Sequence, residues 1–236
     1  MNFTNKVIAV GGATGNLGAA CVTKALKAGA RVAALGRAQS SLARTFPDAP
    51  GNDALLLVDG VDLVDPATAA DAISRIVDRF GRLDAVLNTV GGFAMTPVEE
   101  SDTGEWEKLH AMNCGTALAL TRAAIPALRT AGGGAIVHVG ALAALDAPAK
   151  LGAYAASKAA LHRLVEAAAA ELRADEIRVN AVLPGTIDTP QNRKAMPKAD
   201  TSKWVSPAAI ADAMLMLAGS EARAVTGALI PVTGRG

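Results

Sequence analysis

Short apolar runs alternate along this chain with longer stretches rich in alanine and leucine, and this alternation limits its fold more than any other feature. The short runs have the length and composition of buried strands, and the longer stretches carry apolar residues at helical spacing. Strands that alternate with helices form a parallel sheet with helices on both faces, so the sequence predicts a doubly wound α/β fold. The predicted strands are residues 6–10, 31–35, 54–58, 85–87, 135–139, 178–182 and 229–232. The predicted helices are residues 17–28, 67–80, 105–128, 153–174 and 207–218.

A single domain of residues 1–236 with one seven-stranded sheet is expected, because no change in composition marks a linker and no repeat of solenoid length is present. The chain has 236 residues, 51% of them hydrophobic, which is enough to bury a large core and too apolar for a disordered chain. Its two cysteines, Cys21 and Cys114, stand far apart in apolar surroundings, so we expect a reduced, cytoplasmic protein.

The charge balance and the apolar pattern exclude several classes of partner. The 23 Lys and Arg residues against 22 Asp and Glu residues give a formal net charge of +1, so no basic field attracts nucleic acid. No stretch reaches the roughly 18 consecutive apolar residues of a membrane span, and no export signal is visible after Met1. The histidines His110, His138 and His162 lack metal-ligand spacing and are interpreted as structural, so no metal site is predicted.

A glycine-rich turn follows the first predicted strand, because residues 11–18 read GGATGNLG and a helical pattern begins within them. Glycines at such a turn let the backbone approach a diphosphate, whose negative charge meets the free amides at the helix N-terminus. The position of the motif favours a dinucleotide-binding turn over a merely tight turn. The predicted phosphate-binding residues are Gly12, Thr14, Gly15, Asn16, Leu17 and Gly18.

Gly36 and Arg37 stand after the second predicted strand, where an acidic residue would bind the adenosine ribose of NAD. Glycine leaves room there, and arginine can hold a phosphate through two hydrogen bonds. The pair therefore predicts NADP(H) in preference to NAD(H). A solvated surface arginine is the alternative interpretation.

Tyr154 is the single tyrosine of the chain, and Lys158 follows it at four residues' distance, on the same face of a predicted helix. A phenol with a pKa of about 10 is a poor acid or base at neutral pH, and a nearby cation lowers that pKa. The pair can therefore exchange a proton with a substrate. The same spacing also occurs on an ordinary amphipathic helix, so the pair alone decides nothing.

Residues 188–205 form the least regular stretch of the chain, polar and interrupted by prolines, directly after a predicted strand. Ligands of open parallel sheets bind outside the carboxyl ends of the strands. We therefore expect this loop to cover a substrate as a lid, with a plain connection as the alternative.

Taken together and in order, these motifs resemble the short-chain dehydrogenase/reductase family over nearly the whole chain. The set consists of the glycine turn, Asn88-Thr89-Val90-Gly91, Asn113, Tyr154 with Lys158, and Pro184-Gly185 leading to Thr189. The resemblance implies a Rossmann-type fold, a nicotinamide cofactor and an oxidoreductase that acts on a small molecule.

The resemblance also implies a role for each matching residue. It makes Tyr154 the group that gives or takes the proton, Lys158 the residue that binds the nicotinamide ribose, and Asn113 the support of a water-linked proton relay. It places Asp62 and Leu63 against the adenine. The residues that it implies around the sheet centre and the nicotinamide end are Asn88, Gly91, Pro184, Gly185, Ile187 and Thr189.

Two positions of the chemical motifs depart from the family pattern. Gly11 replaces the usual threonine of the glycine turn, and Ala141 stands thirteen positions before Tyr154, where the family has its catalytic serine. Losing a hydrogen bond to a developing alkoxide typically costs about a hundredfold or more in rate. Ordinary ketone reduction is therefore not the first expectation.

Within the family, the dihydropteridine reductase branch works without that serine. Residues 140–146, 154–164 and 183–204 are similar to that branch. The chain differs from it at Gly36, where the branch has an acidic residue, and at Phe93, where it has a tryptophan.

Three functional hypotheses follow. The first is an NADPH-preferring reductase of a quinonoid dihydropterin or a similar planar acceptor, with Tyr154 as the proton donor. The second is a carbonyl or alcohol dehydrogenase in which Thr89 or a water replaces the donor of the serine, and the third is an inactive NADP-sensing protein. The helices around 117–128 and 154–172 are apolar on more than one face, which predicts a homodimer or homotetramer.

Overall fold

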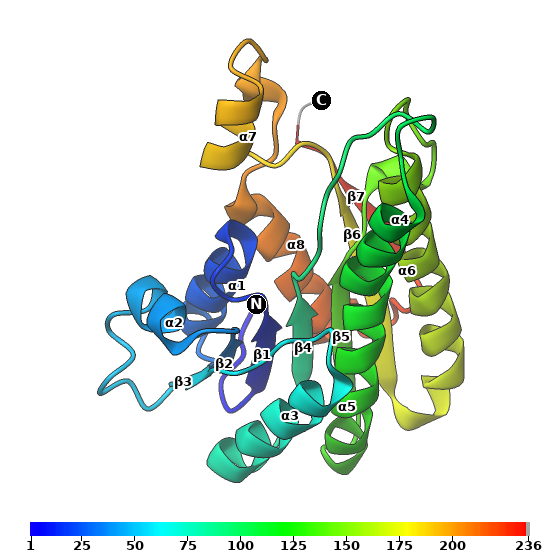
Figure 1. Ribbon diagram of the computed structural model, residues 1–236. Helices are drawn as coiled ribbons and strands as arrows, with labels where there is room; N and C mark the ends of the chain where they lie inside the picture. The colour runs from blue at the N-terminus through cyan, green and yellow to red at the C-terminus, as the bar shows by residue number, and fades with distance from the viewer. Residues whose placement is uncertain (235–236) are drawn as a thin grey trace.

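A seven-stranded sheet forms the centre of the protein, and all of its strands are parallel (Figure 1). The structure, a computed structural model, describes residues 1–234. The strands are β1 (Val7–Gly11), β2 (Arg31–Leu35), β3 (Leu55–Val58), β4 (Ala85–Asn88), β5 (Gly134–Val139), β6 (Ile177–Pro184) and β7 (Leu229–Val232). They confirm the Rossmann-type prediction, and each strand boundary agrees with its predicted position to within two residues.

The strand order β3-β2-β1-β4-β5-β6-β7 places the start of the chain in the middle of the sheet. From β1 the chain builds outward to β2 and β3, returns to β4, and then builds outward on the other side. The reversal between β1 and β4 leaves a crevice at the carboxyl ends of these two strands, because their connections leave in opposite directions. Both the glycine turn and the segment after β4 start at this crevice.

The helices pack on both faces of the sheet. They are α1 (Asn16–Lys27), α2 (Gln39–Thr45), α3 (Pro66–Phe80), α4 (Thr103–His110), α5 (Thr116–Thr130), α6 (Gly152–Glu171), α7 (Pro190–Ala195) and α8 (Pro207–Ala218). One core cluster joins α3, α5 and α6 to one face, and a second joins α1, α2 and α8 to the other. No helix of residues 1–234 has the length and apolar character needed to cross a membrane.

The predicted helix 105–128 differs from the observed structure in its interior. The helix starts earlier, at α4, and a π-helical turn, η1 (Ala111–Gly115), separates α4 from α5. A π turn inserts one extra residue into a helix without changing its apolar character, so hydrophobic spacing does not reveal it. The insertion is relevant to function because Asn113 lies inside it.

Residues 188–205, predicted as an irregular loop that covers a substrate, contain regular structure. They contain α7 and a short 3-10 turn, η4 (Thr201–Lys203), and a parallel bridge between Ile187 and Val205 closes the base of the segment. Helix α7 begins at Pro190, and the Thr189 hydroxyl caps it by accepting from the amide of Asn192 at 3.1 Å. Figure 1 shows the segment rising above the carboxyl edge of the sheet.

Candidate active site

The glycine turn between β1 and α1 leaves no space for a side chain at Gly12 or Gly18. Gly12 has a φ of +74°, and a Cβ there would lie 2.9 Å from the Thr89 Oγ1 atom. A Cβ on Gly18 would clash with the carbonyl oxygen of Gly12. The turn therefore brings the N-terminus of α1 close to the ends of β1 and β4, and no side chain caps this terminus, so its first backbone amides are available to an anion.

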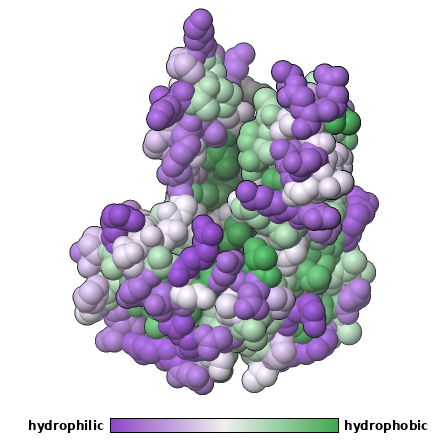
Figure 2. Space-filling view, in the orientation of Figure 1, coloured by the Kyte–Doolittle hydropathy of each residue, from purple (hydrophilic) through white to green (hydrophobic). Residues whose placement is uncertain are grey.

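A cavity of about 650 Å³ opens next to this turn at the carboxyl ends of the strands. The structure brings together in its wall the predicted residues Gly12, Thr14, Gly15, Arg37, Asp62, Leu63 and Gly91. Val90, Lys108, Ala111, Met112 and Thr116 complete the wall that faces the turn, and sequence reasoning did not find them as site residues. Figure 2 shows the surface hollowed above the sheet, with hydrophobic side chains inside the hollow, between the α7 segment and the block that contains α4 and α6.

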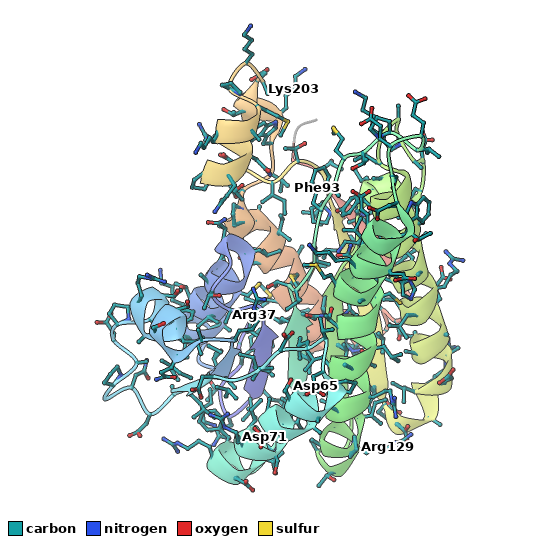
Figure 3. The ribbon with its side chains drawn as sticks, viewed as in Figure 1. Arg37, Asp65, Asp71, Phe93, Arg129 and Lys203 are labelled. Atoms are coloured by element: carbon teal, nitrogen blue, oxygen red, sulfur yellow. The ribbon has the colours of Figure 1, made fainter. Side chains whose placement is uncertain are left out.

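Arg37 lies at one end of the cavity, next to the carboxyl end of β2. Its neighbour Gly36 is buried against Leu42 of α2, and a Cβ at Gly36 would lie 3.0 Å from the Leu42 Cγ atom, so the position admits only a very small residue. The Arg37 side chain is exposed, and none of the salt bridges among residues 1–234 includes it. Figure 3 places Arg37 low in the site, near the glycine turn, and Phe93 higher, between α7 and α4.

Asp62 and Leu63 form the turn after β3. The Asp62 Oδ1 atom accepts from the amide of Val64 at 3.2 Å, and its backbone carbonyl accepts from the Thr68 hydroxyl at 2.7 Å. Leu63 is buried, so the turn presents a fixed apolar and backbone surface to the cavity.

Asn88 lies in the sheet and outside the cavity wall. Its Oδ1 atom accepts from the amide of Val90 at 3.2 Å, and its Nδ2 atom lies 3.3 Å from the His138 Nδ1 atom. The other ring nitrogen of His138 lies 3.1 Å from the Thr121 hydroxyl. Burial, followed by the charge of Lys158, lowers the pKa of His138 to about 3, so the ring is neutral and links β4, β5 and α5.

Asn113 projects from the π turn toward the segment after β4. Its Nδ2 atom donates to the carbonyl of Gly92 at 3.1 Å and to the Ser157 hydroxyl at 2.9 Å, and its Oδ1 atom accepts from the Gly92 amide at 2.9 Å. A Cβ on Gly91 would lie 2.8 Å from that Oδ1 atom, so only glycine fits there. Ser157 was missed by sequence reasoning, although its position between Tyr154 and Lys158 was a signal.

Tyr154 and Lys158 extend from the same face of α6, as predicted. The Lys158 Nζ atom donates to the carbonyl of Val139 at 2.6 Å, and a Cβ on Gly91 would lie 3.2 Å from it. Lys158 therefore borders the segment that lines the cavity. The Tyr154 ring packs edge-on against Phe93, with 5.0 Å between ring centroids and 67° between planes.

The two pKa values differ from the expectation that the lysine lowers the pKa of the tyrosine. Burial raises the pKa of Tyr154 to about 12, and burial lowers the pKa of Lys158 to about 8. In this structure the ammonium is directed to a backbone carbonyl, so desolvation outweighs the attraction between a phenolate and the cation. At neutral pH Tyr154 is a protonated phenol.

Ala141 follows β5 and is 5% exposed. Its amide donates to the Nε2 atom of His162 at 3.4 Å. Thr89, which we considered as a replacement donor, uses its hydroxyl on the carbonyls of Gly11 at 2.8 Å and Gly12 at 3.3 Å. The interpretation of Thr89 as a free donor was therefore wrong.

The predicted residues after β6 lie at the base of the α7 segment and outside the cavity wall. Pro184 ends the strand, Gly185 approaches Thr233, and Thr189 caps α7. Asn16, at the start of α1, donates to the Gln191 Oε1 atom of α7 at 2.9 Å. The segment is thereby tied to the glycine turn across the site. The predicted residues that do not reach the cavity wall are Asn16, Leu17, Gly18, Asn88, Asn113, Tyr154, Lys158, Pro184, Gly185, Ile187 and Thr189.

No group of three His, Cys, Asp or Glu side chains within residues 1–234 is arranged to hold a metal ion. The donors at the cavity and its border include backbone amides, Arg37, the exposed Lys108 and the buried Lys158. Such donors suit phosphate and hydroxyl groups. Gly12, Gly15 and Gly91 line the cavity without side chains, which fits a close approach of a dinucleotide to the backbone.

Comparison with known proteins assigns the family. The model of the short chain dehydrogenase family matches residues 6–200. The chain is 32% identical to 2,5-dichloro-2,5-cyclohexadiene-1,4-diol dehydrogenase LinX of Sphingobium indicum, over 98% of this chain and 96% of the relative. It is 31% identical to 2-(R)-hydroxypropyl-CoM dehydrogenase of Xanthobacter autotrophicus, over 98% of each. A short-chain type dehydrogenase/reductase from Mycobacterium ulcerans superposes with a TM-score of 0.92 at 25% identity, over 100% of this chain and 90% of that one.

This chain belongs to the short-chain dehydrogenase family, whose members are oxidoreductases that use NAD or NADP. The similarity to the dihydropteridine reductase branch stays a prediction.

Proposed function

We propose that this protein is an NADP-dependent oxidoreductase that reduces an activated planar acceptor of the quinonoid dihydropterin type, with Tyr154 as the proton donor. One observation carries the proposal. Gly91 lines the dinucleotide-sized cavity, and the same residue packs against Lys158 and Asn113 of the tyrosine-bearing site. The cofactor cavity therefore borders, at one glycine, the lysine that lies one helical turn from Tyr154 on α6.

Different residues of the cavity bind different parts of the cofactor. Backbone amides of residues 12–18 hold the diphosphate, Asp62 and Leu63 hold the adenine, and Arg37 holds the 2′-phosphate. The segment from Pro184 through Ile187 to Thr189 borders the nicotinamide end. Arg37 is exposed and free of acidic partners among residues 1–234, and its planar fork matches a phosphate through two hydrogen bonds.

Bound NADPH supplies the hydride, and the remaining tasks belong to side chains of this chain. The acceptor gains that hydride and the proton of Tyr154, whose pKa of about 12 keeps the phenol protonated before transfer. Lys158 holds the ribose hydroxyls next to Tyr154, and its charge stabilises the phenolate that remains after transfer. Asn113 fixes the Gly91–Gly92 backbone and, through Ser157, the first turns of α6.

Ala141 determines which acceptors suit the site. Its methyl group gives no hydrogen bond, its amide is used by His162, and the Thr89 hydroxyl is used by backbone carbonyls. A ketone that becomes an alkoxide needs such a donor, whereas a nitrogen-rich dihydropterin ring accepts hydride without forming an alkoxide. This difference supports the pterin-type acceptor.

The relatives favour a second candidate. LinX and 2-(R)-hydroxypropyl-CoM dehydrogenase carry the names of a diol and an alcohol dehydrogenase. In this reading the protein interconverts an alcohol and a carbonyl compound, with Tyr154 as the sole side-chain donor to the oxygen.

The rate of NADPH or NADH oxidation with each class of acceptor distinguishes these candidate functions. Purified protein is mixed with NADPH or NADH and with freshly generated quinonoid dihydropterin, and in parallel with a panel of cyclic ketones. We expect turnover with the dihydropterin that is faster with NADPH than with NADH. Turnover with ketones alone supports the second candidate, and cofactor binding without any turnover supports the sensing protein.

Two further properties belong to the proposal. Residues 188–205 act as a lid whose closed position is supported by the hydrogen bond from Asn16 to Gln191. The chain forms a homodimer or homotetramer, for which the exposed Leu118 on α5 offers apolar surface. Light scattering tests the second property, and a monomeric mass contradicts it.

A further inference from the structure

Residues 140–151 connect β5 to α6, and α6 is the helix that carries Tyr154. Two side chains of α6 hold the start of this connection. Lys158 donates to the carbonyl of Val139 at 2.6 Å, and His162, four residues later, accepts from the amide of Ala141 at 3.4 Å. Tyr154, Lys158 and His162 are spaced four residues apart, so all three lie on one face of the helix.

The space around His162 is shaped for this contact. The side chain is buried, with the residue 1% exposed. A Cβ on Gly140 would lie 2.5 Å from the His162 Nε2 atom and 2.5 Å from the Leu183 Cδ2 atom. Glycine at position 140 is therefore required for the imidazole to reach the backbone of the next residue.

The protonation state of the ring suits an acceptor. Because Nε2 accepts from an amide, the ring proton lies on Nδ1. Burial, and then the charges of Lys158 and Arg163, lower the pKa of His162 to about 4. The ring is therefore neutral, with Nε2 free to accept, throughout the neutral range.

Among residues 1–234, no side chain other than His162 forms a hydrogen bond with Ala141. Its methyl group forms no hydrogen bond, and its carbonyl accepts from the amide of Ala144 at 3.2 Å within the local turn η2 (Leu142–Ala144). The hydrogen bond from the Ala141 amide to His162 is thus a direct polar link between the start of this turn and α6.

We propose that His162 is a positioning residue, which holds Ala141 and the connection 140–151 in register with Tyr154 on the same helix. This inference rests on the proposed function insofar as the connection forms the substrate side of the site. The role is distinct from that of a donor to substrate, because the imidazole lies buried behind the Gly140–Ala141 backbone. The hydrogen bond to His162 fixes the backbone of this wall at position 141, where the side chain has no hydroxyl.

A pair of variants of similar size separates the hydrogen bond from packing. His162→Gln keeps a neutral acceptor at the same reach, whereas His162→Met fills the space with a weak acceptor. A net hydrogen bond corresponds to roughly a fivefold effect. We expect His162→Met to raise amide exchange of the peptide 140–151 about fivefold and to lower kcat by a similar factor, with the dissociation constant of NADPH unchanged. His162→Gln should stay within about twofold of the unmodified protein in all three measurements.

The exposed His110→Gln serves as the control and should change none of the values. The inference is overturned if His162→Met and His162→Gln show the same amide exchange of the peptide 140–151 and the same kcat. The hydrogen-bond acceptor at position 162 then has no effect. Faster exchange spread evenly over the chain in both variants also overturns it, since His162 is then a packing residue alone. If the unmodified protein shows no turnover, the proposed function fails, and the exchange comparison still decides the role of His162.

Discussion

The two halves of the site are built in different ways. On the cofactor side, at the ends of β1, β2 and β4, the shape depends on close backbone packing, because Gly12, Gly18 and Gly91 have no room for a side chain. On the proposed substrate side lie Phe93 after β4, Ala141 after β5 with His162 behind it, and the α7 segment after β6, and here contacts between side chains or with side chains hold the structure. The cofactor half is therefore fixed by backbone packing that only glycine satisfies at these positions, whereas the substrate half depends on individual side chains.

The largest loss of kcat is expected from a substitution of Tyr154, where the two halves of the site meet. Tyr154→Phe removes the proton donor and keeps the ring that packs against Phe93. General acid catalysis contributes about 10²–10⁴-fold, so we expect kcat to fall about a thousandfold. Steady-state oxidation of NADPH measures the loss, and fluorescence titration should show unchanged cofactor binding. Activity within about threefold of the unmodified protein rules out Tyr154 as the donor.

These halves also differ in how far the sequence predicts them. Apolar alternation predicted β1 to β7, and glycine spacing predicted Gly12 and Gly15 of the cavity wall, because a parallel sheet and a diphosphate turn have strict local requirements. Asp62 and Leu63 were predicted only through the resemblance to the family. The π turn around Asn113 was missed, since it leaves the apolar pattern unchanged. Helix α7 was missed although Thr189 and Pro190 are a capping signal.

The contact of His162 with Ala141 could not be predicted at all. It joins residues 21 positions apart through a gap that exists because Gly140 lacks a side chain. The raised pKa of Tyr154 was likewise missed, because it depends on burial rather than on the neighbouring lysine in sequence.

The second prediction concerns the cofactor half. Arg37→Gln removes a charged hydrogen-bond donor from the end of the cavity. Hydrogen bonds to charged groups contribute about 1.5–3 kcal/mol, so the preference for NADPH over NADH should fall by roughly 10- to 100-fold. The ratio of kcat/KM for the two cofactors measures it. Arg44→Gln, on the exposed face of α2, is the matched control, and a preference unaffected by Arg37→Gln would make Arg37 a surface residue only.

The third prediction concerns the buried lysine between the halves. The pKa of Lys158 is lowered from 10.5 to about 8, so between these pH values the unfolded chain binds the proton more readily than the folded protein. Stability therefore rises with pH across this window. We expect the free energy of unfolding of the unmodified protein, relative to Lys158→Met, to increase by about 2 kcal/mol from about pH 7 to about pH 10.

Urea denaturation at the two pH values provides that comparison. Lys27→Met, which changes an exposed lysine of α1, should show no such dependence. A difference between the unmodified protein and Lys158→Met that stays constant with pH would mean that Lys158 has its ordinary pKa.

The smallest predicted effect lies in the substrate half. Ala141→Ser adds a hydroxyl where the site offers an alkyl group, and its partial fit should raise activity with ketones about tenfold, below the full value of an oxyanion donor. Activity with quinonoid dihydropterin should stay within about twofold. Equal changes with both classes of acceptor, measured as kcat/KM, would show that position 141 does not determine the acceptor.

The central claim is that one dinucleotide joins the two halves, with its phosphates on the glycine turn and its nicotinamide at Tyr154. A crystal structure of the protein with NADP tests this claim most directly. We predict the 2′-phosphate within hydrogen-bond distance of the Arg37 guanidinium, the diphosphate at the amides of residues 12–18, and the nicotinamide ring adjacent to the Tyr154 hydroxyl. NADP bound with its nicotinamide away from Tyr154, or bound outside this cavity, would contradict the account.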